Sequence, residues 1–133
     1  MTFHLARVGQ VAMSVADVDR AEDFYGRTLG LAKLYRFGDL LFFDCAGLRL
    51  MLQRSAGTSK VEAASPLYFA CADLGLAMAE LTARGVAFTT GPTKIAAMED
   101  HDLWMAFFAD PDGHLLALMC EAPKGHVFEE TPG

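Results

Sequence analysis

Two stretches of the chain repeat one short pattern at a fixed separation, and this repeat constrains the fold more than any other feature. In segments 41–52 and 104–121, two adjacent Phe residues are followed by Asp, then Gly, then a second apolar run. The Asp residues, the Gly residues and the pair Met51 and Ala117 are each 66 positions apart. A structural module used twice produces such a separation. We therefore expect two copies of one unit.

The later stretch also predicts its own local structure. The aromatic run Trp104–Phe108 leads into Asp110-Pro111-Asp112-Gly113, and the apolar run Leu115–Met119 follows. Proline presets φ for a turn and Gly113 tolerates positive φ, so the chain can reverse there. The two runs are expected to pair as an antiparallel hairpin.

The remaining elements follow the same plan in both halves. In the first half, hydrophobic patterning and turn residues predict a strand, a helix capped by Asp17 and ended by Gly30, and three strands, over 8–15, 18–29, 31–37, 40–45 and 48–53. In the second half the order recurs, with a helix between the cap Asp73 and Gly85 and with strands over 67–72, 86–90, 93–98, 104–108 and 115–119. Asp17 and Asp73 are 56 residues apart, so the two halves also correspond at a second separation, shorter than the 66 residues found above. Residues 54–65 are expected to connect the halves.

The predicted fold class is therefore α+β, with two βαβββ modules spanning about 1–53 and 65–121. One βαβββ module is too small to bury both faces of its sheet. We expect each helix on an outer face and the remaining sheet faces to form one curved, mixed-sheet cleft, within a single domain of residues 1–121. Residues 122–133 are expected to form a C-terminal tail.

Composition excludes several classes of function. The net charge of −6 and the lack of any Lys/Arg-rich run argue against nucleic-acid binding. No apolar run approaches the roughly 18 residues of a membrane span, and no signal peptide is evident. Cys45, Cys71 and Cys120 lie in apolar runs without a Cys-x-x-Cys pair, so we expect reduced thiols in a cytoplasmic protein.

With these elements in place, the sequence resembles the vicinal-oxygen-chelate superfamily, which includes glyoxalase I, bleomycin-resistance proteins and extradiol dioxygenases. The resemblance extends to about Glu121 and depends on three motifs, Gln10-Val11-Ala12 with Asp17, Ala21-x-x-Phe24-Tyr25 before Leu29-Gly30-Leu31, and Asp110-Pro111-Asp112-Gly113. It implies paired βαβββ units, a homodimer and a small organic ligand bound in the cleft. Many members also hold a divalent metal there with four side chains.

The four metal-ligand positions of the superfamily fall on Gln10, Met51, Pro66 and Ala117. Among these only Gln10 carries a donor suited to a hard or borderline divalent ion. We therefore predict neither the usual metal nor any other cofactor. A rearranged metal site that uses His4, Gln10, His101 and Glu121 remains an alternative.

Period-two alternation indicates which side chains face the cleft once these four positions are taken to point into it. The helix-covered face is then apolar, with Val11, Met13, Val15, Leu50, Leu52, Leu67, Phe69, Leu116 and Leu118. The predicted ligand-binding set is Gln10, Ser14, Arg49, Met51, Tyr68, Trp104, Ala117, Met119 and Glu121. Trp104 is included because it could stack on a planar ligand near His101.

His101 is the candidate catalytic residue, since it lies in an acidic loop from which it could act as a general base. Three functions remain open. The favoured one is a metal-independent small-molecule-binding protein of the bleomycin-resistance type. The second is a lyase, isomerase or dioxygenase with a displaced metal or with His101 as acid/base. The third is a catalytically inactive paralogue, so whether the protein is an enzyme stays undecided at this level.

Overall fold

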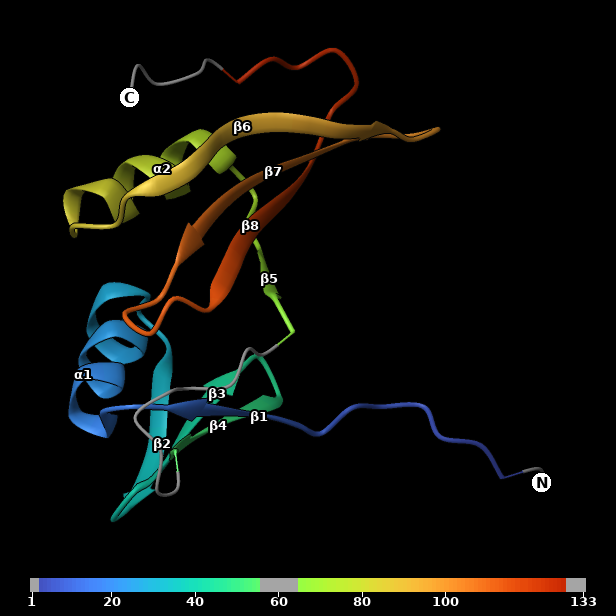
Figure 1. Ribbon diagram of the computed structural model, residues 1–133. Helices are drawn as coiled ribbons and strands as arrows, with labels where there is room; N and C mark the ends of the chain where they lie inside the picture. Colours follow the sequence, from blue (N-terminus) through green and yellow to red (C-terminus); the bar gives the residue numbers. More distant parts are fainter. Residues whose placement is uncertain (1–2, 56–64, 129–133) are drawn as a thin grey trace. The chain divides into compact units, whose positions relative to one another are not determined.

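Two compact units make up the chain, Met1–Glu62 and Ala63–Gly133. The computed structural model describes residues 3–55 and 65–128, and each unit is described by itself below (Figure 1). The expected connector over 54–65 and the end of the expected tail therefore fall largely outside the described residues. The predicted α+β class with two βαβββ modules is confirmed.

The first unit contains one four-stranded sheet and one helical segment. Its elements are β1 Gln10–Val15, α1 Val18–Glu22, the π-helix η1 Asp23–Thr28, β2 Ala32–Phe37, β3 Leu40–Cys45 and β4 Leu48–Arg54. The strand order is β1-β4-β3-β2, with β1 parallel to β4 and the other pairs antiparallel.

The second unit repeats this topology. Its elements are β5 Leu67–Ala70, α2 Leu74–Ala83, β6 Phe88–Ala97, β7 Asp102–Ala109 and β8 Leu115–Ala122. The order β5-β8-β7-β6 again has one parallel pair, β5 with β8. The module repeat predicted from sequence is therefore present in the topology.

The predicted helix boundaries follow from capping. The carboxylates of Asp17 and Asp73 accept hydrogen bonds from the backbone N–H of Arg20 and Leu76 at 3.1 and 3.0 Å. Gly30 and Gly85, which follow the two helical segments, have φ of 80° and 97°.

The first helix differs from the expected continuous α-helix. After Glu22 its hydrogen bonds shift to the wider π pattern, in which Leu29 N–H bonds to the carbonyl of Phe24 at 2.9 Å. Apolar spacing could not predict this change, because α and π turns bring similar residues to the buried side.

One expected break between strands is also absent. Gly91-Pro92 was expected to divide two strands, but β6 runs through it as one strand. The pairing with β7 shifts register on both sides of this dipeptide. As the edge strand of its sheet, β6 accommodates a proline that a central strand would not.

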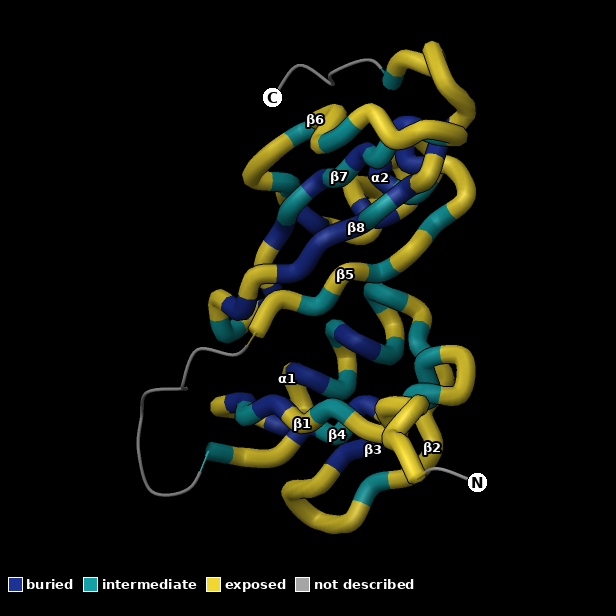
Figure 2. Tube along the Cα trace, turned by 90° about the vertical axis from the view of Figure 1, so that its right-hand side faces the viewer, coloured by how far each residue is buried: buried dark blue, intermediate teal, exposed yellow. Residues whose placement is uncertain are grey.

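Each hydrophobic core lies between a sheet and its own helix. In the first unit Tyr25 and Phe43 are fully buried, with ring centroids 6.3 Å apart. In the second unit Leu74 of α2 and Leu116 and Phe108 of the sheet are fully buried. Figure 2 shows a long buried stretch along β8, whereas buried and half-buried residues alternate along β7. The predicted apolar face is buried or half-buried throughout, which confirms the alternation along β1, β4, β5 and β8.

The turn that joins the last two strands of each unit is one residue longer in the second unit than in the first. The β3–β4 pairing closes at Cys45 and Leu48 around Ala46-Gly47. In the β7–β8 hairpin the corresponding closure joins Asp110 N–H to the carbonyl of His114 at 3.0 Å, around three residues. Strand β8 is thus offset from β4 by 66 residues, whereas β7 is offset from β3 by 65. The constant offset expected for the Asp residues therefore does not hold in the strand pairing.

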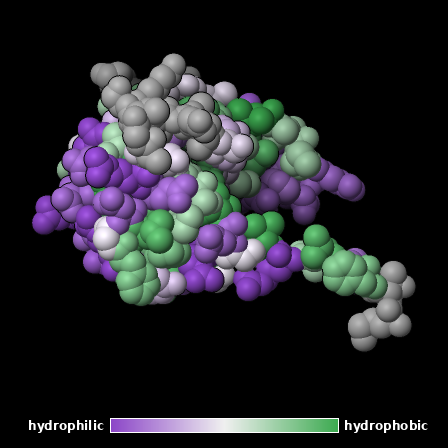
Figure 3. Space-filling model, turned by 60° about the horizontal axis from the view of Figure 1, so that its bottom comes forward, coloured by the Kyte–Doolittle hydropathy of each residue, from purple (hydrophilic) through white to green (hydrophobic). Residues whose placement is uncertain are grey.

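The segment ahead of β1 is extended and apolar. Phe3 and Leu5 are more than four-fifths exposed, and Val8 is exposed as well. Figure 3 shows mostly green atoms of this arm projecting from the surface. Within the first unit it is anchored by a hydrogen bond from Arg7 Nη1 to the carbonyl of Gly47 at 3.1 Å and by one from the backbone N–H of Arg49 to the carbonyl of Gly9 at 2.9 Å.

Candidate functional site

One face of the first sheet is not covered by α1 and η1, and we call it the first open face. Period-two alternation along β1 and β4 places four predicted site residues there, namely Gln10, Ser14, Arg49 and Met51. They are exposed or half-buried, whereas their strand neighbours Met13, Leu50 and Leu52 are buried.

An aromatic cluster occupies the middle of the first open face. Strand pairing aligns Ala12, Met51, Phe42 and Tyr35 in one row across all four strands. The Tyr35 ring lies 4.6 Å from the Phe42 ring and 5.2 Å from that of Phe37, measured between centroids. Tyr35 and Phe37 are exposed, at 39% and 68%.

Our sequence analysis did not include these aromatic residues in the site. The missed signal was the alternation in 35–37 and 40–43, where every second residue shares a face. The face of an edge strand is fixed by its pairing, and β2 has a register shift between Lys33 and Tyr35. That shift changes which residues point outward, and only the structure shows where it occurs.

Arg49 is held against this cluster. Its Nη1 donates a hydrogen bond to Tyr35 Oη at 3.1 Å, and its guanidinium carbon lies 5.9 Å from the centroid of Phe42. Next to it on β1, the amide of Gln10 makes, among the described residues, a single long contact, to Met51 Sδ at 3.9 Å. A thioether is a weak acceptor, so this amide retains hydrogen-bonding capacity.

The second unit has an equivalent uncovered face, the second open face. It carries the predicted residues Tyr68, Ala117, Met119 and Glu121. In one row Tyr68, Ala117 and Phe107 are neighbours, and the rings of Tyr68 and Phe107 lie 6.3 Å apart in edge-to-face contact. Ala117 is fully buried although it belongs to this face.

His101 lies at the edge of the second open face, between two carboxylates. Its Nδ1 is 2.7 Å from Asp100 Oδ1, and its Nε2 is 3.9 Å from Glu121 Oε1. The hydrogen bond to His101 is the main cause that lowers the pKa of Asp100. Two residues selected from sequence, His101 and Glu121, are therefore neighbours in the structure.

Trp104 lies on the other face from the rest of the predicted set. It pairs with Cys120 on the side covered by α2, is 8% exposed, and packs edge-to-face on Phe128 at 5.3 Å. The expected stacking role is inconsistent with this position. Strand β7 begins at Asp102, and Asp102 and Trp104 share the covered side.

The four positions at which the superfamily holds a metal do not fit a divalent ion. Gln10 supplies one amide oxygen, Met51 a thioether, and Pro66 and Ala117 no side-chain donor. In addition, Ala117 is buried in the row with the rings of Tyr68 and Phe107.

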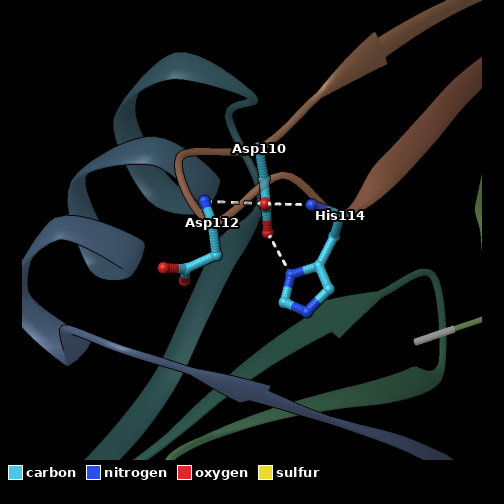
Figure 4. Close-up of side chains that lie close together, drawn as sticks. All are labelled: Asp110, Asp112 and His114. Carbon is cyan, nitrogen blue, oxygen red and sulfur yellow. Dashed lines mark hydrogen bonds and ion pairs between the residues drawn. The ribbon is translucent and has the colours of Figure 1, made fainter. Parts of the chain in front are cut away.

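A different group, Asp110, Asp112 and His114, offers three ligand atoms within 4.8 Å of one another (Figure 4). Two of the three side chains, those of Asp110 and His114, are already bonded within the turn. Asp110 Oδ1 accepts from the backbone N–H of Asp112 at 3.0 Å and of His114 at 2.8 Å, and Asp110 Oδ2 lies 2.7 Å from His114 Nδ1. A metal held by the Asp110 carboxylate and His114 Nδ1 would have to compete with these bonds, so the geometry of these two side chains favours a clamped turn.

The cysteines are poor nucleophiles in this structure. Burial, followed by the neighbouring Cys120, raises the pKa of Cys71 to about 11. Burial also raises the pKa of Cys45. Thiolate chemistry at neutral pH is therefore disfavoured at both residues.

A hollow of about 560 Å³ lies beside η1 in the first unit, and sequence reasoning did not predict it. It is lined by Asp19, Glu22, Asp23, Gly26, Arg27, Leu31, Lys33 and Phe43. Its two cations, Arg27 and Lys33, already pair with Asp23 and Glu22. Its charge is thus largely balanced internally.

Structural comparison shows the same fold in proteins of low sequence identity. An integron cassette protein from the mobile metagenome of V. cholerae is 20% identical with a TM-score of 0.75, over 90% of this chain and 98% of that one. A glyoxalase/bleomycin resistance protein/dioxygenase from Alicyclobacillus acidocaldarius is 22% identical (TM-score 0.69, 86% and 91% covered). A lactoylglutathione lyase from Agrobacterium tumefaciens is 18% identical (TM-score 0.71, 87% and 94% covered).

No curated protein matches the sequence significantly. Among the described residues, no helix is long and apolar enough to cross a membrane. The model of the Glyoxalase/Bleomycin resistance protein/Dioxygenase superfamily matches residues 7–118. The chain therefore belongs to this superfamily, as its repeat and motifs indicated.

Proposed function

We propose that this protein binds a small organic ligand on the first open face, without a divalent metal at the superfamily positions. The observation that carries the proposal is the aromatic row with Tyr35 and Phe42, bordered by the side chains of Arg49 and Gln10. Apolar surface with a few placed polar groups is the usual composition of a small-molecule site.

The donor set supports metal independence. A divalent ion needs several oxygen, nitrogen or thiolate ligands around one point. Gln10 and Met51 are adjacent on this face, and only the Gln10 amide is a suitable ligand. An organic ligand can use the same two side chains, because thioether and amide groups form apolar contacts and hydrogen bonds.

Metal independence is tested by elemental analysis of the freshly purified protein and by thermal denaturation with Ni²⁺, Zn²⁺, Mn²⁺ or Fe²⁺. We expect substoichiometric metal and no rise of the melting temperature, because a specific ligand would stabilise the folded state by mass action. Stoichiometric metal with a clear rise would overturn this part of the proposal. Asp110→Asn and Met51→Ala would then show which group holds the ion.

Ligand binding is tested by screening planar organic compounds for thermal stabilisation in the presence of a chelator. A compound bound on the first open face should lose affinity at least fivefold in Tyr35→Ser. The matched control is Leu76→Ser, which removes an exposed apolar side chain from α2, in the second unit. Equal loss in both variants would contradict the assigned face.

An enzymatic function is the second candidate, and the surroundings of His101 favour it. A histidine whose Nδ1 is held by a carboxylate presents Nε2 for proton transfer, and here Nε2 faces Glu121. A general base so placed could serve a lyase, isomerase or dioxygenase reaction of the superfamily. Such activity would require the substrate to reach the second open face.

The two candidates are separable by turnover. If a substrate is converted, His101→Gln should lower kcat at least 100-fold with little change in ligand affinity. His126→Gln, which alters an exposed histidine in the C-terminal segment, is the control. Tight stoichiometric binding without conversion supports the binding protein. If the protein neither binds nor converts any tested compound, the inactive paralogue is supported.

We also propose that the protein is a homodimer, as the superfamily resemblance implies. The exposed apolar arm with Phe3, Leu5 and Val8 supports this proposal, since association would remove it from water. Light scattering coupled to gel filtration should give twice the chain mass of 14.4 kDa. A monomer at micromolar concentration would contradict it.

A further inference from the structure

We infer that the ligand of the first open face is an apolar, ring-containing molecule that carries an oxyanion group, and that Arg49 selects for this charge. The inference depends on the proposed binding function and adds the chemical class of the ligand. It is carried by the state of the Arg49 guanidinium, which differs from that of most other cations in the chain.

Most described cations are already neutralised by carboxylates. Seven have a nitrogen within 4.0 Å of a carboxylate oxygen, namely Arg27, Lys33, Arg36, Arg54, Arg84, Lys94 and Lys124. In the part of the chain that the structure describes, Arg49 has no such neighbour. Its polar contact is the neutral hydroxyl of Tyr35.

A carboxylate partner was available and is not used. Asp44 is directly opposite Arg49 in the β3–β4 pairing. However, Asp44 Oδ1 accepts a hydrogen bond from the backbone N–H of Gly47 at 3.0 Å, which holds it to the turn. Arg49 instead turns toward Tyr35 and Phe42, so its positive charge lies beside an aromatic surface.

The donors around this point are suited to an oxyanion. A guanidinium has five N–H donors in a planar fork, and one bond to Tyr35 leaves the others available. The Gln10 amide lies on the neighbouring strand in register with Arg49, and the Tyr35 hydroxyl can also donate. An anion placed here would receive charge-assisted hydrogen bonds while its ring lies along Tyr35, Phe37 and Met51.

Two fluorescent probes that differ by one charged group test this inference. The probes are 1-anilinonaphthalene-8-sulfonate and its neutral analogue N-phenyl-1-naphthylamine, titrated into the full chain. We expect the wild-type protein to bind the sulfonate at least tenfold more tightly than the neutral probe. In Arg49→Gln the sulfonate should lose about tenfold in affinity, and the neutral probe should change less than twofold.

Two further variants make the test specific. Arg54→Gln removes the same charge from an arginine paired with Asp39 and should leave both affinities within twofold. Arg49→Lys keeps the charge without the planar fork and should bind the sulfonate with intermediate affinity. Circular dichroism and the melting temperature of each variant exclude unfolding, which would itself increase binding of these dyes.

The outcomes distinguish the two proposals. If both probes bind and Phe42→Leu weakens both, but Arg49→Gln leaves their ratio unchanged, the charge selection is wrong and the binding face stands. If neither probe binds the folded protein, both the charge selection and the proposed binding face are overturned. An equal loss of sulfonate affinity in Arg49→Gln and Arg54→Gln would show that the net charge of the protein causes the effect. That result would refute the assignment to Arg49.

Discussion

The two open faces share one row of positions but fill it in opposite ways. In the first unit the row runs from small Ala12 through large Met51 to Phe42. In the second unit the equivalent positions are large Tyr68, small Ala117 and Phe107. The first row stays partly open, whereas rings flank Ala117 on both neighbouring strands of the second.

The polar residues of the two faces differ as well. Arg49 gives the first face a cation beside aromatic rings, and His101 with Glu121 gives the second an imidazole beside a carboxylate. A duplicated module thus supplies one backbone twice, while the side chains differ enough that we propose an anionic ring compound as the ligand of the first face and proton transfer as the second candidate function, on the second face. The comparison also indicates why fold membership alone does not define the function of this chain.

The largest expected effect comes from placing a glutamate into each row. Ala117→Glu would put a carboxylate into a fully buried position between two rings and should lower the free energy of unfolding by about 3 kcal/mol or more. Met51→Glu, at a half-buried position, should cost about 1 kcal/mol. Urea denaturation measures both, and equal costs would contradict the difference between the rows.

The turns of the two hairpins provide the next test. Asp110→Ala removes two bonds to backbone N–H groups, one buried and one partly buried, and the buried contact with the His114 ring, and should cost about 3 kcal/mol. Asp44→Ala removes one exposed bond to Gly47 and should cost about 1 kcal/mol. Urea denaturation measures the loss of unfolding free energy in each variant. A ratio of the two losses close to one would contradict the clamped-turn interpretation.

Acid should weaken the second unit through Asp102. Its carboxylate accepts from the N–H of Gly125 and from Lys124, with Lys94 nearby, and the bond from Gly125 is the main cause that lowers its pKa below 3.8. Because the folded state favours the ionised form, this stabilisation is present above pH 3.8 and is lost as the pH falls through the lowered value.

Asp102→Asn should therefore lower the melting temperature by several degrees at pH 7. As the pH falls through the lowered pKa of Asp102, the difference between the wild-type and variant proteins should shrink, because the wild-type carboxyl becomes protonated. Differential scanning calorimetry at a series of pH values measures this. A difference that is constant with pH would show that packing, and not ionisation, makes Asp102 important.

The smallest effect concerns the two-residue turn of the first unit. Ala46 has φ of 52°, the one non-glycine residue with positive φ among those described. Ala46→Gly should stabilise the protein by about 1 kcal/mol, since glycine adopts this conformation without strain. Gly47→Ala, with φ of 98° at the wild-type residue, should destabilise by a similar amount in urea denaturation and is the matched control.

Most of the fold was predictable because it depends on local chemistry. The caps Asp17 and Asp73, the terminating Gly30 and Gly85 and the period-two strands all act through neighbouring residues, and each was found where expected. The π-turns of η1 and the continuous β6 were missed. Both depend on how a segment fits its neighbours, which periodicity does not encode.

The candidate site was predictable only in part for the same reason. Residues on β1, β4, β5 and β8, such as Gln10 and Met119, were assigned to the open faces by alternation from known motifs. Tyr35, Phe42 and Phe107 were missed, and Trp104 was expected near the ligand although it is on the covered side. Their faces depend on the pairing of β2, β3 and β7, including a register shift between β2 and β3 that the sequence does not reveal.

The sequence by itself determined the duplicated βαβββ plan, the superfamily and the lack of suitable donors at the four metal positions, because these follow from residue type and spacing. Only the tertiary structure decided which side chains are neighbours across strands. The contact of Arg49 with Tyr35 and Phe42, the flanking of Ala117 by aromatic rings and the placement of His101 beside Glu121 all join residues distant along the chain. Such contacts are set by strand register, and a shift of one residue would turn each side chain to the opposite face.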